Sequence, residues 1–211
     1  MSLIGKALSV VGLQLKSAHD VRWTDERGQG GSAGNAGEVV SASSSLGLSA
    51  VWGCANLISG TLSSLPFEIR RHTQEGVAEV VRDHPVHKVI YASPNYDQTA
   101  LDFWDFMNLS LELWGNAYAS VVRRDGQVTA LYPIQPEAMS VRRLGTGRIE
   151  YRWAENGTDH VRLDRDVLHI RGPGGNPLGG MSTLRFGLQT FSSALAADRA
   201  AAGMFRNGLR P

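Results

Sequence analysis

Apolar side chains recur every three or four residues in three stretches of the chain, and this spacing predicts three long helices. The first runs from about residue 48 to Pro66, the second covers residues 100–114, and an alanine-rich third runs from Ser182 to Arg206. The positions expected on their buried faces are Leu48, Val51, Ala55, Ile58, Leu62 and Leu65 in the first helix, Phe103, Phe106, Met107, Ser110, Leu111 and Trp114 in the second, and Leu184, Leu188, Phe191, Leu195, Ala202 and Phe205 in the third.

Between these helices apolar and polar residues alternate one by one, a pattern typical of strands with one buried face. Residues 66–72 and 77–81 are expected to pair around a turn, and a short helix should follow at 84–92. Two strands joined by Asp125-Gly126, a strong hairpin signal, come after the second long helix. Further strands are expected at 138–144, 147–155, 159–163 and 166–172.

The order helix, hairpin, helix, strands, helix indicates an α+β fold. Residues 1–45 are rich in Gly, Ser and Ala and are expected to form a flexible arm, because they bury too little apolar surface to offset their ordering entropy. The α+β domain is expected over 46–181, and a C-terminal helix that leads into a larger protein over 182–211. A short apolar run after Lys6 fits an amphipathic segment better than a signal peptide, and no run is long enough to span a membrane.

The helix at 100–114 carries more apolar surface than a surface helix of a monomer needs. Leu101, Trp104 and Leu113 lie beyond its main apolar stripe. Trp114 is therefore expected in the core, whereas Trp104, at the edge of the stripe, is expected to contact a neighbouring subunit or domain. Thr99 and Asp102 predict a capping box at the start of this helix.

The charge of the chain gives no support for a global nucleic-acid-binding surface, because the net charge is only +1 over 211 residues. Arginine is far more frequent than lysine among the 21 basic residues, and Arg suits phosphate contacts. Arg123, Arg124, Arg142 and Arg143 are therefore candidates for contact with DNA or a partner, with solvated strand faces as the alternative. The single cysteine, Cys54, excludes an internal disulfide and is expected to be a small buried side chain.

No arrangement of residues typical of an enzyme is found along the chain. A phosphate-binding loop is absent, and the glycine-rich stretch 172–180 contains Pro173 and Pro177, which lack the N–H donors that a phosphate requires. The histidines have no spacing typical of a metal site, and no pair of acids lies in an apolar setting. We therefore expect no enzymatic activity, no metal and no cofactor.

Short motifs occur along the chain in an order that resembles the HK97-type phage portal proteins. They are "LSSLPFEIRR", "DHPVHKVI", "SPN", "LELWGNAYASVVRRDGQV", "LYPIQPEAMSV", "DVLHIRG", "PLGGMSTL" and "FRNGLRP". Each motif is short, but all eight are collinear over about residues 46–211. The residues that match the family are Pro66, His84, Pro85, Pro94, Asn95, Gly115, Asn116, Tyr118, Pro133, Pro136, His169, Gly180, Ser182, Asn207, Gly208 and Pro211.

The resemblance implies a subunit of a ring, typically of twelve copies, at one vertex of a phage capsid. Such a ring conducts double-stranded DNA without reading its sequence. It docks the large subunit of terminase, contacts the major capsid or scaffolding protein, and later holds the head–tail adaptor. It would be found in the virion and, during assembly, in the host cytoplasm. The chain would correspond to the N-terminal, mainly wing-region, half of the family, which is neither an ATPase nor a membrane protein.

Three other functions are compatible with parts of the pattern. A nucleic-acid-binding domain would need one basic face, which the near-zero net charge disfavours. An enzyme would need a pocket with perturbed acids, for which the sequence gives no sign. A capsid-associated adaptor without a channel would be distinguished by its subunit count, because only a portal needs a closed ring.

Overall fold

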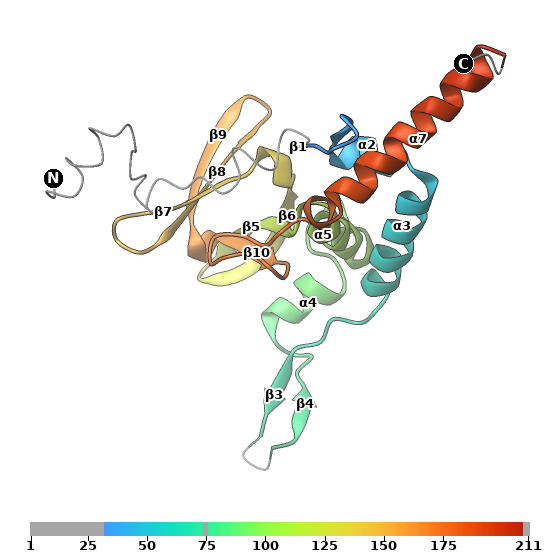
Figure 1. The fold of residues 1–211 in the computed structure, drawn as a ribbon. Helices are drawn as coiled ribbons and strands as arrows, with labels where there is room; N and C mark the ends of the chain where they lie inside the picture. The colour runs from blue at the N-terminus through green and yellow to red at the C-terminus, as the bar shows by residue number, and fades with distance from the viewer. Residues whose placement is uncertain (1–31, 74–75, 209–211) are drawn as a thin grey trace, which may run out of the picture.

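Helix α5 (Ala100–Trp114) packs across the three-stranded sheet of β5, β6 and β10, and this pair forms the centre of the molecule (Figure 1). The other elements surround it. The structure is a computed structural model and describes residues 32–73 and 76–208. In chain order the elements are β1 Ser32–Ala33, β2 Val39–Val40, α2 Ala42–Leu46, α3 Ser49–Ser63, β3 Arg70–His72, β4 Ala78–Val80, α4 Pro85–Tyr91, α5 Ala100–Trp114, β5 Asn116–Arg124, β6 Gln127–Ile134, η1 Pro136–Ala138, β7 Ser140–Arg143, β8 Ile149–Glu155, β9 Thr158–Leu163, η2 Asp164–Asp166, β10 Val167–Arg171, α6 Thr183–Phe186 and α7 Leu188–Arg206.

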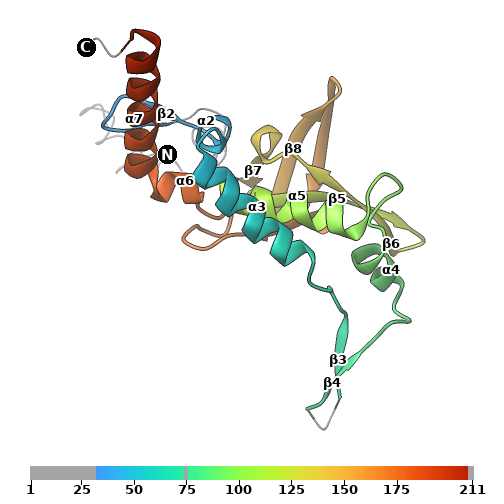
Figure 2. The same ribbon diagram turned by 90° about the vertical axis from the view of Figure 1, so that its right-hand side faces the viewer.

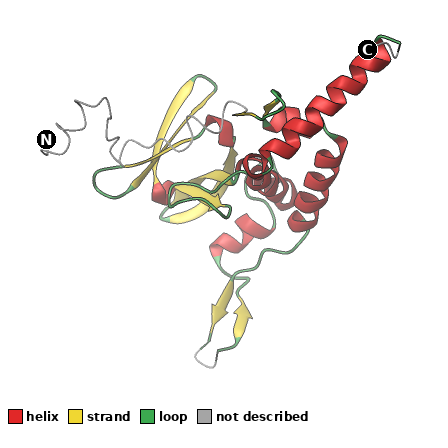
Figure 3. Ribbon diagram, in the orientation of Figure 1, coloured by secondary structure: helices red, strands yellow, loops and turns green. Residues whose placement is uncertain are grey.

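The predicted α+β fold is confirmed, with the long helices gathered on one side and the two larger sheets on the other (Figure 3). Both sheets are antiparallel, with strand orders β10-β5-β6 and β7-β8-β9. The predicted hairpin is present, since Asp125 and Gly126 join β5 to β6 with φ angles of 52° and 80°. These values match a tight turn that requires left-handed backbone at both positions.

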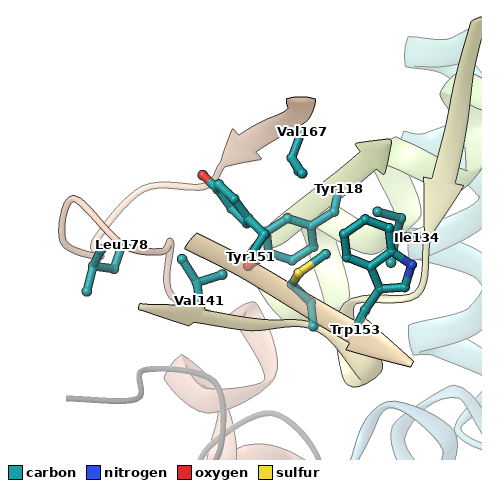
Figure 4. Packing of buried hydrophobic residues seen from close by; sticks show 8 residues of the cluster. Tyr118, Ile134, Val141, Tyr151, Trp153, Val167 and Leu178 are labelled. Carbon is teal, nitrogen blue, oxygen red and sulfur yellow. The ribbon is translucent and has the colours of Figure 1, made fainter. Parts of the chain in front are cut away.

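A cluster of buried side chains joins the two sheets (Figure 4). Tyr118, Ile134 and Val167 come from the first sheet, and Tyr151 and Trp153 come from β8 in the second. Tyr151 and Trp153 therefore lie on one buried face of β8, although Glu150 between Ile149 and Tyr151 is buried as well. Tyr118 is the largest of the fully buried side chains.

Helix α5 is buried from more than one side, which explains its broad apolar surface. Phe103, Trp104 and Met107 pack against β5 and β6, whereas Leu113 belongs to a second cluster with Leu184 of α6. The capping box predicted at the start of the helix is confirmed. At Trp104 and Leu113 the width of the apolar surface thus reflects contacts within the chain, whereas Leu101 is exposed.

The expectation that Trp104 lies at the edge of the buried face is wrong. Its side chain is 7% exposed and stacks on Phe67 with ring centroids 3.9 Å apart. Its Nε1 donates a hydrogen bond to the carbonyl oxygen of Ile90 at 2.9 Å. A side chain held in this way offers little surface to a neighbouring subunit. Trp114, expected in the core, is only half-buried.

Helix α3 also packs differently from the prediction. The buried residues of α3 are the small residues Ala55, Ser59 and Ser63, and the element that α3 mainly contacts is α5. Of the stripe expected to be buried, Ile58, Leu62 and Leu65 are exposed. Cys54, expected to be buried, is exposed as well. Small residues let the two helix backbones approach closely, and this close approach decides which face is inside.

The flexible arm predicted over residues 1–45 is wrong for its last part, and residues 1–31 lie outside the described residues. From Ser32 the chain forms β1, β2 and α2, which lie beside α7. Gly34 approaches so closely that a Cβ there would lie 2.3 Å from the Cβ of Ser192. Glu38 completes the attachment through a salt bridge to Arg199 at 2.7 Å.

The C-terminal helix predicted as continuous from Ser182 is divided at Gly187 into α6 and α7. Leu184, Leu188, Phe191 and Leu195 pack together as expected. Beyond them α7 extends away from the body (Figure 2), so that Ala202 and Phe205, expected on the buried face, are exposed.

The described residues contain no helix that is long and apolar enough to cross a bilayer. Within the same part of the chain, no three side chains of the His, Cys, Asp and Glu types come together as metal ligands.

We predict that replacing Trp104 by Ala lowers the free energy of unfolding by about 3–5 kcal/mol, because it leaves a large cavity between α5 and Phe67. The same change at half-buried Trp114 should cost clearly less. Chemical denaturation of the two variants measures both values. Equal losses, or a larger loss for Trp114→Ala, would contradict this placement of the two side chains.

Candidate functional site: a polar junction beneath the C-terminal helices

Gly115 ends helix α5 at a point where three segments of the chain meet. Its φ of 70° is left-handed, and its N–H donates to the carbonyl oxygen of Leu111 at 2.8 Å. A Cβ on Gly115 would lie 2.3 Å from the carbonyl carbon of Met181, and one on Gly180 would lie 2.2 Å from the oxygen of Gly115. The Gly172 N–H donates to that same oxygen at 2.8 Å. The segments therefore touch backbone to backbone, with no room for a side chain at either glycine.

Asn116, the first residue of β5, fastens these segments together through its side-chain amide. Its Oδ1 accepts from the Gly180 N–H at 2.7 Å. Its Nδ2 donates to the carbonyl oxygens of Gly180 and Trp114, both at 3.1 Å. One buried side chain thus satisfies backbone groups from both sides of the contact, and such groups would be costly to leave unpaired.

His169 of β10 completes the network from the neighbouring strand. Its Nε2 lies 3.0 Å from Asn116 Oδ1 and its Nδ1 lies 3.2 Å from the Tyr151 hydroxyl. The Asn116 amide nitrogen already donates twice, so Oδ1 is an acceptor and His169 Nε2 must donate. Nδ1 then accepts from the Tyr151 hydroxyl. Burial, with a smaller effect of Arg171, lowers the pKa of His169 to about 3, so the ring is neutral at physiological pH.

Ser182 ties the start of α6 to the end of α5. Its Oγ donates to the carbonyl oxygen of Leu113 at 2.6 Å and accepts from the Leu184 N–H at 3.1 Å. It is therefore both a helix cap and a link between two helices. We call Gly115, Asn116, His169, Gly180 and Ser182 the polar junction.

A second contact of the same kind involves the predicted Pro-Asn motif. Asn95 is buried, and its Nδ2 donates to the carbonyl oxygen of Leu131 in β6 at 2.9 Å. The Leu131 N–H in turn donates to the carbonyl oxygen of Pro94 at 2.8 Å. The loop before α5 is thereby fixed to the sheet on which α5 packs.

Among the remaining motif residues, Tyr118 contacts the polar junction, because its ring lies 4.4 Å from that of His169. The others lie apart from the junction, at the ends of elements, inside strands or in connections. His84 caps α4, where its Nδ1 accepts from the Val86 N–H at 3.2 Å, and Pro85 is the first residue of that helix. Pro66 follows α3, Tyr118 lies in β5, Pro133 lies in β6, and Pro136 is the first residue of η1. At the other end of the chain Asn207 caps α7, and Gly208 follows it with a φ of 65°. Pro211 lies outside the described residues.

Two of the four candidate arginines are held by carboxylates. Arg123 lies 3.1 Å from Asp166. Arg142 lies 2.7 Å from Glu150, which also receives Arg152 at 2.6 Å. Arg143 donates weakly to a turn carbonyl oxygen at 3.4 Å, and Arg124 is exposed. Contact of these arginines with DNA or a partner remains a prediction, with less free charge than the sequence suggested.

Glu112 of α5 is a titratable group that the sequence analysis passed over. No partner among the described residues reaches its Oε1, and the same is true of Nδ2 of Asn108 one turn earlier. Burial, with a smaller effect of Asp105, raises the pKa of Glu112 to about 7. The only signal in the sequence is the spacing of polar residues three and four apart on a helix that is otherwise apolar.

The polar junction is suited to fixing the fold rather than to catalysis. Its amide, imidazole and hydroxyl groups all take part in hydrogen bonds inside the chain, and its histidine is neutral. Its members come from the end of α5, the start of β5, β10 and the loop before α6. The junction therefore holds the C-terminal helices at a defined position on the sheet.

Comparison with known proteins identifies the class. The model of the phage portal protein family matches residues 49–211. The portal protein of Enterobacteria phage HK97 is 30% identical over 167 residues, which are 78% of this chain and 39% of that protein. The chain belongs to the phage portal protein family.

Two solved structures have the same fold. The crystal structure of an HK97-family phage portal protein from Corynebacterium diphtheriae is 21% identical, with a TM-score of 0.53 over 77% of this chain and 49% of that one. The neck of a native GTA particle, computed with C12 symmetry, contains a chain that is 17% identical, with a TM-score of 0.65 over 92% of this chain and 51% of that one. The chain thus spans about half the length of these two solved chains and 39% of the length of the HK97 portal protein.

We predict that Gly115→Ala destabilises the protein far more than Gly126→Ala. Both glycines have left-handed φ angles, so each substitution should cost about 1–2 kcal/mol of backbone strain. Only at Gly115 does the new methyl group meet backbone, whereas nothing lies within 4 Å at Gly126. Thermal or denaturant unfolding compares the two variants. Similar losses would show that the three segments do not meet as described.

We predict a pH-dependent stability that Glu112→Gln removes. The carboxyl has a pKa of about 7 in the folded chain against an ordinary 4.5, so the folded state binds more protons between these values. Its contribution to stability is full below about pH 4.5 and is lost as pH rises through about 7. The melting temperature of Glu112→Gln minus that of the wild type should therefore increase from pH 5 to pH 8. Exposed Glu155→Gln is the control, and a difference that does not change with pH would refute the prediction.

Proposed function

We propose that this chain is the wing-region part of a portal subunit, whose ring forms the passage for double-stranded DNA at one capsid vertex. The observation that carries the proposal is the polar junction. Residues from motifs far apart in the sequence converge there and fix the C-terminal helices on the α+β body. This arrangement is what a subunit needs if a helical segment must hold a set orientation inside a closed ring.

The shape of the molecule supports the same role. Helix α7 extends from one side of the body and the β3–β4 hairpin from another (Figures 1 and 2). The nineteen residues of α7 give it a length of roughly 28 Å at 1.5 Å per residue. In the proposed ring, the body lies outside and α7 leads toward the central passage.

The partners follow from this proposal. The near-neutral charge of the chain suits DNA that passes without sequence-specific contacts, because strong phosphate binding would hold it back. The large subunit of terminase during packaging, the major capsid or scaffolding protein during assembly, and the head–tail adaptor later would bind the assembled ring. We propose no catalytic step for this chain, so DNA movement would use the energy of the partner motor.

The test is the subunit count of the purified chain. We expect a closed ring, and twelve copies when it forms in a capsid, by native mass spectrometry and electron microscopy. We also expect no steady ATP turnover by the protein alone. An open filament in place of a ring, or a stable monomer of the complete subunit to which this chain is proposed to belong, would contradict the portal role and favour a capsid-associated adaptor.

A further inference from the structure

The large apolar residues of helix α3 do not lie on the side of the helix that faces the rest of the protein, as they would in a helix that only covers a core. Val51, Cys54, Ile58 and Leu62 follow one another at intervals of three or four residues and so form one stripe along the helix, and Leu65 comes just after the helix ends. Ile58, Cys54, Leu62 and Leu65 are exposed, and Leu65 is exposed to 54%. The side turned to α5 consists instead of small residues. The large apolar side chains are therefore left without cover among the described residues.

The surroundings of this stripe carry no charge. No Asp, Glu, Lys, Arg or His occurs between Glu38 and Glu68, so the whole of α2 and α3 is neutral. A solvent-facing helix normally carries charged residues on its outer side. A neutral surface of this kind excludes nucleic acid or an acidic partner, which would need basic groups, and suits an apolar protein surface.

The β3–β4 hairpin that follows α3 is charged, since Arg70, Arg71, His72 and Glu79 are exposed, but it carries exposed apolar side chains as well. This hairpin projects from the body (Figure 2) and pairs only with itself within the described chain. Its exposed apolar side chains include Val77 and Val80. An isolated two-stranded hairpin is marginally stable in water, so it too has the character of an element that rests on another molecule.

The occupant that fits is a second copy of the same chain. The chain itself presents another apolar surface on different elements, around the 92–99 loop, where Tyr91, Tyr96, Leu101 and Tyr132 are exposed. A closed ring requires two different, complementary surfaces on every copy. The GTA neck that shares this fold was computed with C12 symmetry, as expected where copies of one chain lie side by side.

We propose that the apolar stripe of α3, extended by the β3–β4 hairpin, is the surface on which the neighbouring copy docks in the ring. This assignment rests on the proposed portal function and adds to it the segment that makes the contact. Cys54, the only cysteine of the chain, lies on the stripe and becomes covered when the ring forms.

The experiment uses this native thiol. Maleimide labelling of Cys54 in the wild-type chain is followed from dilute protein to the concentrations at which native mass spectrometry shows rings. We expect the labelling rate to fall at least tenfold on assembly. Ile58→Asp should abolish assembly and keep labelling fast, while its melting temperature stays close to that of the wild type, because the side chain is exposed in the single copy.

Asn56→Asp is the matched control. It adds the same charge to the same helix, but two residues away, which is 200° around the helix axis and thus nearly on the opposite side. It should leave assembly intact. If both Asp variants assemble like the wild type, the proposal is wrong.

The other outcomes separate this inference from the proposed function. A closed ring in which Cys54 reacts at the full rate would overturn the docking surface and leave the portal role standing. A monomer of the complete subunit with a reactive Cys54 would overturn both. Slow labelling at every dilution, in a chain that stays monomeric, would show that another part of the same molecule covers the stripe, and would also overturn the proposal.

Discussion

The whole arrangement depends on one close contact between backbones, where Gly115 meets the segment 180–182 beneath the end of α5. At this point the chain has no space for a Cβ, and the amide of Asn116 pairs the polar groups that the contact buries. Glycine alone permits such an approach, and a buried amide with all its hydrogen bonds made keeps it in a single register. The position of α6 and α7 relative to the sheet follows from these two conditions.

The contact is linked directly to the core between the sheets. His169 joins Asn116 on one side and Tyr151 on the other, and its ring lies 4.4 Å from that of Tyr118. Because burial keeps the imidazole neutral, the network contains no charge whose loss or gain would disturb it near neutral pH. Glu112 differs, since its carboxyl titrates near pH 7 on the helix that leads into the contact.

Local patterns in the sequence were sufficient to predict most helices and strands, but not which of these elements pack against one another. The capping box at Thr99 and the Asp125-Gly126 turn depend on neighbouring residues, and both were predicted correctly. The faces of α3 and the position of Trp104 depend on which helix approaches which, and a periodic pattern cannot distinguish a stripe that meets the core from one that meets another copy. The motif residues of the polar junction were recognised, but their convergence arises from contacts between residues up to 69 positions apart, which no local pattern encodes.

Helix α7 is fixed near its N-terminal end and extends free of the body beyond it, so it acts as a lever. With a length of roughly 28 Å, a rotation of about 5° at its base moves its tip by about 2.5 Å, close to half a helical turn. The strap of residues 32–40 shortens the free arm, because Glu38 holds Arg199 more than halfway along the helix. The angle between the body and α7 is thereby fixed at two points, the base of the helix and Arg199. In an assembly of many copies, any remaining deviation in this angle would be repeated in every copy and would add up.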